Sequence, residues 1–167
     1  QLHASYTLGI DNSKEMLAKT QWLQADNLFF KEHDIQTFSS SEPFNLVISN
    51  AALQWVPNHF HLFKQLTHLL APGGQLAIQL PANQNYPTHI IAAELAAEQP
   101  FKKALKKTIA PIHHLLTMEE YAQLFEELGF ESQVVRLQLY AHFLESTASV
   151  IEWVKGSLLT YYKSQLE

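Results

Sequence analysis

Short apolar segments of strand length alternate with helical segments along the first half of the chain. Four such segments predict strands, at residues 6–10, 28–30, 44–49 and 75–80. The apolar spacing within 14–23 and within 60–70 predicts a helix after the first strand and another after the third. Strands and helices that alternate in this way favour an α/β domain with a largely parallel sheet.

The pattern changes after Pro81, where helices begin to dominate. Helical segments are predicted at 88–98, 101–109 and 146–165, the last with a break at Gly156. Thr117 and Glu120 match a capping box and Gly129 supplies a stop, which predicts a helix over 117–128. The alternation over 131–143 predicts one long strand. We expect one domain made of two parts, residues 1–82 and 83–167.

The composition excludes several classes of protein. With 47% hydrophobic residues, 5 glycines and 7 prolines among 167 residues, the chain is neither disordered nor collagen-like. Eleven basic against sixteen acidic residues give a net charge of −5, and this provides no basic field for nucleic acid. The absence of cysteine excludes disulfides and thiolate metal sites. Since no segment resembles a signal peptide or a membrane span, we expect a soluble cytoplasmic protein that binds neither nucleic acid nor membrane.

Polar residues follow three of the predicted strands, where ligands of open parallel sheets bind. Asp11 could accept hydrogen bonds from both hydroxyls of a ribose, or it could cap the next helix. Asp34 could accept the amine of an adenine while Ile35 packs on the ring, or it could form a surface turn. The small residues of segment 49–57 would let a ligand approach the backbone beside Trp55; alternatively, Trp55 belongs to the core.

Four sequence segments resemble, in this order, the consecutive motifs of class I S-adenosylmethionine-dependent methyltransferases: GIDNSKEML, HDI, FNLVISNAALQWVPNH and LAPGGQLAIQLP. The segments NAALQWVPNH, LPANQNYPTH and EWVKGS most resemble the trans-aconitate 2-methyltransferase group within that superfamily. The resemblance implies a Rossmann-like, seven-stranded α/β sheet with flanking helices. It also implies methyl transfer from S-adenosyl-L-methionine to a carboxylate of a small organic acid such as trans-aconitate, giving a methyl ester.

The resemblance assigns roles to individual residues of this chain. Residues 1–82 would form the cofactor-binding core, with contacts from Ile10, Asp11, Asn12, Asp34, Ile35, Asn50 and Ala51. Residues 83–167 would form a helical substrate-side region with one long strand. The candidates for binding the acceptor are Trp55, His59, Asn83, His89, Arg136, Tyr140 and His142, although a histidine taken alone is more often structural or solvated.

No catalytic side chain and no metal site are expected. Because the reference pKa of a carboxyl group is about 4, a carboxylate acceptor is already ionised at neutral pH. It therefore needs no general base. Catalysis would come from alignment of the reactants and exclusion of water. Arg136 is the only arginine, so within this chain it alone can grip a carboxylate with two parallel hydrogen bonds.

The resemblance is interrupted at both ends of the chain. In the family, a first strand and a glycine-rich loop precede the strand that ends in the Asp11-type residue, whereas here only Gln1–Ser5 precede Tyr6. We expect the sheet to lack that first strand and loop and also the last strand, which leaves sheet edges unpaired. Two alternatives follow: a nicotinamide-dependent Rossmann oxidoreductase, for which Asp11 is equally suited, and a catalytically inactive methyltransferase-like fragment. No feature predicts an oligomeric state.

Overall fold

The computed structural model describes residues 4–20, 22–23, 25–105, 114–156, 158–163 and 165–166. The chain divides into two compact units. Unit 1 consists of Gln1–Ile48 and Phe60–Ala77, and unit 2 of Ser49–His59 and Ile78–Glu167.

The first sheet of unit 1 is a parallel pair. Strand β1 (Thr7–Asp11) pairs with β2 (Leu28–Glu32), so that Thr7 lies opposite Leu28 and Asp11 opposite Glu32. Helix α1 (Lys14–Ala18) follows β1, and its N-cap Ser13 accepts a hydrogen bond from the backbone of Met16 at 3.2 Å. The prediction of a helix over 14–23 is wrong in length. Met16, one of the apolar residues whose spacing predicts this helix, is 51% exposed, and a short helix without a buried face gains little stability.

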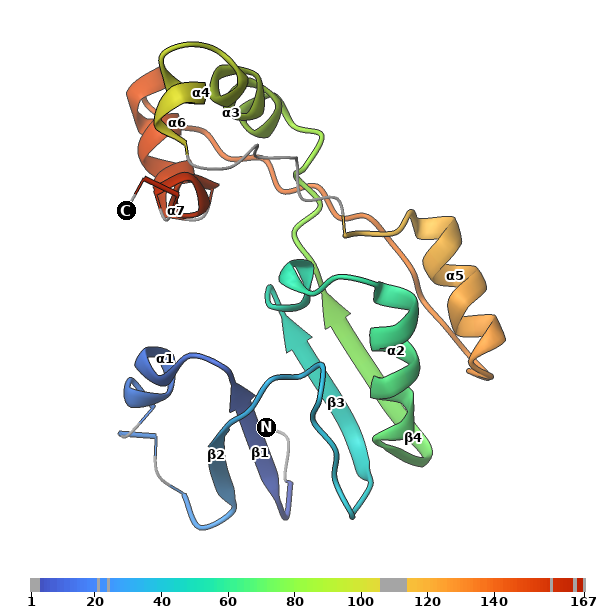
Figure 1. Ribbon diagram of the computed structural model, residues 1–167. Coiled ribbons are helices and arrows are strands. Elements are labelled where there is room, and N and C mark those ends of the chain that lie inside the picture. The colour runs from blue at the N-terminus through green and yellow to red at the C-terminus, as the bar shows by residue number, and fades with distance from the viewer. Residues whose placement is uncertain are drawn as a thin grey trace. The chain divides into compact units, whose positions relative to one another are not determined.

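The second sheet pairs β3 (Phe44–Asn50) with β4 (Leu70–Gln79). The backbone N–H of Phe44 donates to Leu69 at 2.8 Å and that of Ala51 to Gln79 at 3.0 Å. These bonds lie at opposite ends of the pair, so the two strands run in the same direction (Figure 1). Strand β4 begins earlier than the predicted 75–80 and includes the segment 71–74 that predicts a turn, with Gly73 at a φ of +74°.

The predicted single sheet is not continuous. The four strands of the described residues form two separate pairs, β1–β2 and β3–β4. The predicted long strand at 131–143 is also wrong, because this segment has no regular secondary structure. A strand is defined by its hydrogen-bonded ladder, and alternation of side chains alone cannot supply the neighbouring backbone.

The core of unit 1 is built on α2 (His59–His68). Phe63 and Leu66 are 1% exposed, and Leu62, Leu69 and Phe38 are also buried. The amide of Gln65 donates to the carbonyl of Phe38 at 3.2 Å and so ties the helix to the loop after β2. The helical spacing predicted this face, although Phe60, which shares the spacing, is 48% exposed.

Unit 2 is mainly helical. Its elements are a 3₁₀ turn (Leu53–Trp55), α3 (Pro87–Ala97), α4 (Phe101–Ala104), α5 (Met118–Glu127), α6 (Thr147–Lys155) and α7 (Leu158–Lys163). The predicted break at Gly156 is confirmed. The predicted helix over 101–109 ends at Ala104 as α4, and residues 106–109 lie outside the described residues.

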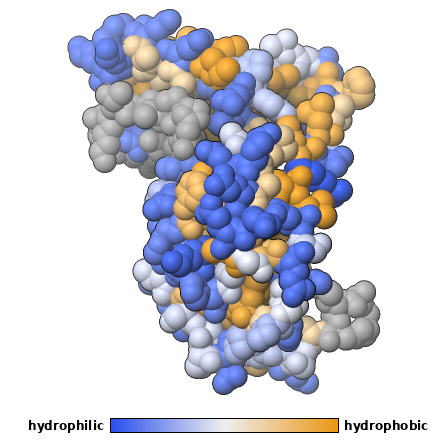
Figure 2. Space-filling view, turned by 90° about the vertical axis from the view of Figure 1, so that its right-hand side faces the viewer, coloured by the Kyte–Doolittle hydropathy of each residue, from blue (hydrophilic) through white to orange (hydrophobic). Residues whose placement is uncertain are grey.

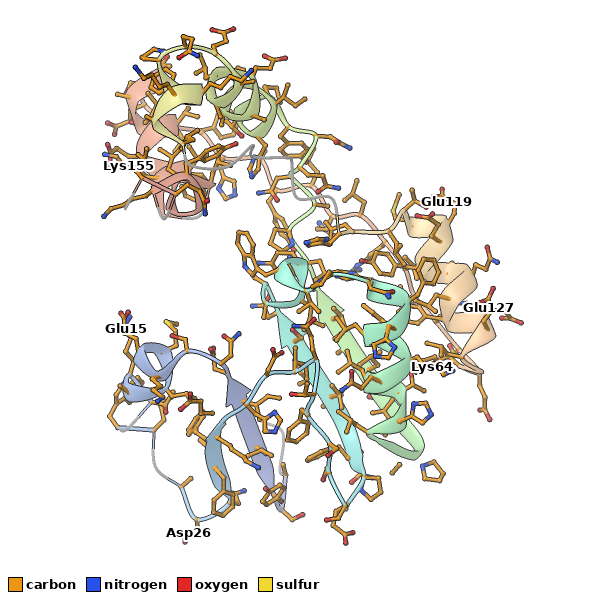
Figure 3. The ribbon with its side chains drawn as sticks, viewed as in Figure 1. Glu15, Asp26, Lys64, Glu119, Glu127 and Lys155 are labelled. Atoms are coloured by element: carbon orange, nitrogen blue, oxygen red, sulfur yellow. The ribbon has the colours of Figure 1, made fainter. Side chains whose placement is uncertain are left out.

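The capping box predicted for α5 is confirmed. The Thr117 hydroxyl accepts from the backbone of Glu120 at 3.1 Å, and the Glu120 carboxylate accepts from the backbone of Thr117 at 2.8 Å. The side chains of Glu119 and Glu127 extend outward from the helix (Figure 3), whereas Leu124 between them is buried. Helix α5 therefore has a solvent face and a packed face.

Many hydrophobic side chains reach the surface of the chain. Figure 2 shows them among polar residues on the face that it presents. The most exposed examples include Phe143, Val134, Trp22 and Leu139. None of the helices in the described residues combines the length and the apolar character needed to cross a membrane.

We expect Gly74→Ala to destabilise the fold by about 1–3 kcal/mol, because the added methyl group overpacks the β3–β4 pair. A Cβ at Gly74 would lie 2.8 Å from the Ala71 carbonyl oxygen and 3.0 Å from that of Phe44. Gly156→Ala is the matched control, since a Cβ there has no neighbour within 4 Å. Urea unfolding of both variants measures the difference, and equal midpoints would contradict the prediction.

Candidate cofactor and acceptor site

The carboxyl ends of β1 and β2 bring two predicted cofactor segments side by side. The backbone N–H of His33 donates to the carbonyl of Asp11 at 3.0 Å. This bond extends the parallel ladder one step past the strand ends, so Asp11 and Asp34 lie at the same edge of the sheet. The neighbouring Ile10 and Ile35 are half-buried, whereas Asn12 is exposed.

Only one oxygen of the Asp11 carboxylate accepts a hydrogen bond within the described residues. Its Oδ1 accepts from the backbone N–H of Ser13 at 2.8 Å, which holds the start of α1. Its Oδ2 has no hydrogen-bond partner within the described part of the chain. The N-cap of α1 is Ser13, and Asp11 holds the backbone of that residue instead of capping the helix itself. This local role is compatible with ligand binding, because the second oxygen remains an acceptor.

Asp34 forms a local turn. Its Oδ1 accepts from the backbone N–H of Gln36 at 2.9 Å, and the Gln36 amide lies 3.3 Å from Oδ2. The His33 ring is held in the same turn by the Asp34 carbonyl at 3.0 Å and packs edge-on against Phe38. The surface-turn interpretation of Asp34 thus has direct support in hydrogen bonds.

The third predicted cofactor segment begins unit 2, at the end of β3. Ala51 has a φ of +51°, a region that L-residues other than glycine seldom adopt. Two hydrogen bonds hold it there: its N–H donates to Gln79, and its carbonyl accepts from the Gln54 amide at 2.9 Å. The Oε1 of Gln54 is buried and has no partner among the described residues. This turn is therefore tightly held and includes one acceptor that lacks a donor.

Trp55 is not part of the core, because 54% of its surface is exposed. The flanking Leu53 and Val56 are buried instead and anchor the turn. Asn50 and Ala51 are also exposed. The turn therefore presents its predicted ligand-facing residues to solvent.

His59 is the most deeply buried polar residue of the site, at 1% exposed. Its Nε2 lies 3.0 Å from the carbonyl oxygen of Leu53, and its Nδ1 lies 2.5 Å from the hydroxyl of Tyr121 on α5. A carbonyl can only accept, so Nε2 carries the hydrogen and Nδ1 accepts from the Tyr121 hydroxyl. The geometry selects one neutral tautomer of His59.

Burial keeps both members of this pair neutral. It lowers the pKa of His59 from its ordinary value of 6.5, and electrostatic repulsion by His114 acts in the same direction, against the hydrogen bonds of the ring to the backbone of Leu53 and Val56. Burial raises the pKa of Tyr121 to about 12, with Glu120 acting in the same direction and a hydrogen bond from the Leu116 backbone opposing it. The pair is therefore uncharged at neutral pH.

We expect the stability of the chain to fall on both sides of a plateau between about pH 6.5 and 10. The pKa of folded His59 is lowered, so its stabilising contribution is present above pH 6.5 and is lost as the pH falls through the folded pKa. His89 acts in the same direction. The pKa of folded Tyr121 is raised, so its contribution is lost as the pH rises from about 10 to 12. Thermal unfolding against pH measures this, with His59→Gln expected to flatten the acid limb. A melting temperature that rises between pH 7 and 5 would contradict the assignment.

The remaining acceptor candidates all belong to unit 2. Asn83 and His89 are half-buried, and the pKa of His89 is lowered by burial. His142 stacks against Trp153 with ring centroids 4.6 Å apart. Arg136 and Tyr140 are exposed. Within the part of the chain that the structure describes, no hydrogen bond joins any two of these five side chains.

Tyr121 is the residue that sequence reasoning missed. The capping box predicted its helix, and its spacing from Leu124 and Phe125 places it on the packed face. That pattern predicts only burial, because the partner His59 is 62 positions away in the sequence. The described residues also contain no group of three or more histidine, aspartate or glutamate side chains able to hold a metal ion.

The family model and the similar proteins both point to methyltransferases. Residues 2–133 match the model of a protein family that is described as "Methyltransferase domain". The chain is 38% identical to a trans-aconitate 2-methyltransferase of Deinococcus radiodurans, covering 96% of this chain and 62% of that protein. It is 35% identical to a trans-aconitate 2-methyltransferase of Escherichia coli O1:K1 / APEC, covering 92% of this chain and 58% of that protein. The chain thus spans about 60% of the length of the curated relatives it matches.

A solved structure supports the fold. The crystal structure of the plantazolicin methyltransferase BpumL, in complex with a pentazolic desmethylPZN analog and SAH, matches with a TM-score of 0.52 at 22% identity. The match covers 77% of this chain and 48% of that one. The α/β architecture is therefore shared with that methyltransferase.

Proposed function

The chain belongs to the methyltransferase-domain family, and on that premise we propose that it takes part in methyl transfer from S-adenosylmethionine to a carboxylate of a small organic acid. The observation that carries the proposal is the half-buried Asp11 at the end of β1, where one carboxylate oxygen holds α1 and the other is left as an acceptor. A ribose hydroxyl is the donor that such a position suits in nucleotide-binding sheets.

Each predicted cofactor contact is proposed for one part of this cofactor. Asp11 would bind the ribose, Ile10 and Asn12 would flank it, and Asp34 and Ile35 would contact the adenine. Asn50 and Ala51 would lie near the methionine portion. The buried Oε1 of Gln54 lacks a donor among the described residues, and an ammonium group would satisfy it. When bound, S-adenosylmethionine supplies an electrophilic methyl group on a sulfonium.

The acceptor side of the proposal rests on unit 2. Trp55 provides an exposed aromatic wall, and Arg136 provides a cation that can pair with a carboxylate. Asn83, His89, Tyr140 and His142 would complete the acceptor contacts. We place residues 1–82 on the cofactor side and 83–167 on the acceptor side. The names of the relatives favour trans-aconitate as the acceptor and a methyl ester as the product.

The chemistry requires no proton transfer from the protein. A carboxylate acceptor with a pKa of about 4 is ionised at neutral pH and is itself the nucleophile. The chain would therefore act by aligning the carboxylate with the methyl group and excluding water. Both ring nitrogens of His59 are engaged in hydrogen bonds, with the Tyr121 hydroxyl and the Leu53 carbonyl, which is consistent with a site that uses no general base.

The proposal is tested by measuring methyl transfer by the whole protein to a series of possible acceptors. Formation of S-adenosylhomocysteine is followed with trans-aconitate, with other small di- and tricarboxylates, and with the corresponding amides as carboxylate-free controls. We expect turnover with carboxylates and none with amides. No transfer to any small carboxylate would contradict the proposed acceptor, and stabilisation by NAD but not by S-adenosylhomocysteine would contradict the proposed cofactor.

A further inference from the structure

We propose that Tyr121 is a positioning residue that acts through His59 on the turn at the end of β3, here defined as residues 51–56. This inference rests on the proposed function, because the turn carries the predicted cofactor contact Ala51 and the predicted acceptor contact Trp55. It assigns His59 a supporting role instead of direct contact with the acceptor.

The inference rests on two consecutive hydrogen bonds that run from Tyr121 through His59 to Leu53. The Tyr121 hydroxyl donates to Nδ1 of His59 at 2.5 Å, and Nε2 of His59 donates to the Leu53 carbonyl at 3.0 Å. Leu53 is the first residue of the 3₁₀ turn, and its side chain is 4% exposed. The series therefore links α5 to the turn through one buried imidazole, and all of its members belong to unit 2.

The turn needs such support because its backbone is strained. Ala51 and Asn58, on either side of the 3₁₀ turn, have φ values of +51° and +53°. Strained residues persist only where surrounding contacts hold them, and each costs about 1–3 kcal/mol. The Gln54 amide holds Ala51 from within the turn, whereas His59 holds Leu53 from outside it. Loss of the outside contact would release Trp55, which is 54% exposed and has little packing of its own.

The aromatic packing around Tyr121 explains why its hydroxyl can be removed selectively. Its ring stacks with Phe125 at a centroid distance of 6.5 Å and lies 5.9 Å from the His59 ring. Tyr121→Phe keeps the ring and these contacts and removes only the hydroxyl. Position 59 offers a matched pair: glutamine can still donate to the Leu53 carbonyl, whereas leucine fills similar space and donates nothing.

The experiment measures methyl transfer and S-adenosylhomocysteine binding in the whole protein with each variant. We expect Tyr121→Phe to raise the acceptor KM and the Kd for S-adenosylhomocysteine about five- to tenfold, the effect of one lost hydrogen bond. His59→Gln should retain more of both affinities than His59→Leu. Tyr6→Phe, which removes the same atom from a side chain that is 52% exposed, should leave them unchanged.

A spectroscopic measurement separates positioning from general stability. Histidine ¹⁵N spectra of the wild-type protein should show the Nε2–H tautomer of His59 at neutral pH, with an Nδ1 signal shifted by the tyrosine hydrogen bond. Tyr121→Phe should abolish that shift while the tautomer persists. Unchanged KM and Kd in Tyr121→Phe, or equal losses in His59→Gln and His59→Leu, would overturn the inference. A wild-type protein that neither binds S-adenosylhomocysteine nor transfers methyl would instead overturn the proposed function.

Discussion

Asp11→Asn should weaken the binding of S-adenosylhomocysteine by the whole protein about 10- to 100-fold. The asparagine oxygen can still accept from the backbone of Ser13, as the Asp11 Oδ1 does at 2.8 Å, so the start of α1 is retained. The negative charge and the second acceptor oxygen are lost, and a hydrogen bond to a charged group contributes about 1.5–3 kcal/mol. The effect should therefore appear in affinity, with little change in stability.

The controls for this prediction separate binding from folding. Asp26→Asn makes the same chemical change at an exposed aspartate (Figure 3) that has no proposed ligand contact, and it should leave affinity unchanged. Asp11→Ala should lose the affinity and also about 1 kcal/mol of stability, because it also removes the acceptor of the hydrogen bond from the Ser13 backbone. Isothermal titration measures all three variants. Wild-type affinity in Asp11→Asn would show that the Asp11 carboxylate serves only to hold the backbone of Ser13.

Phe63→Ala should destabilise the chain by about 3–5 kcal/mol, the usual cost of removing a buried aromatic side chain. Phe63 is 1% exposed and shares the core of unit 1 with Leu62 and Leu66. The loss is a large share of the about 5–15 kcal/mol by which domains are stable, so cofactor binding should weaken through unfolding. Urea unfolding followed by circular dichroism measures the free energy directly.

Phe60→Ala is the internal control for Phe63→Ala. Both residues lie on α2 and have identical side chains, but Phe60 is 48% exposed. Its removal leaves no closed cavity and should cost less than half as much. Equal losses in the two variants would contradict the assignment of the core to the Phe63 face.

The local features of the fold could be predicted from the sequence. The strand ending at Asp11 and the capping box of Thr117 and Glu120 depend on residues within a few positions of one another, and both are confirmed. The apolar spacing also identified Phe63 and Leu66 as core. Such features follow from periodicity and local hydrogen bonding, which the sequence contains directly.

Features that depend on distant partners could not be predicted. The alternation over 131–143 predicted a strand, but the described segment has none, because a ladder needs a neighbouring backbone. The same reasoning applies to the site. His59 was predicted as an acceptor contact, and nothing near it in the sequence points to the hydrogen bond with Tyr121. The predicted contacts at Asp34 and Trp55 stay predictions, with Trp55 now known to be exposed.

The most direct test of the proposed function is the fate of a methyl group labelled in S-adenosylmethionine. The whole protein is incubated with the labelled cofactor and trans-aconitate, and the product is analysed by mass spectrometry before and after mild alkaline hydrolysis. We expect one labelled methyl group on the acid, released by alkali as an ester requires. Label that stays on the cofactor, or that survives alkaline hydrolysis on the product, would contradict methyl transfer to a carboxylate.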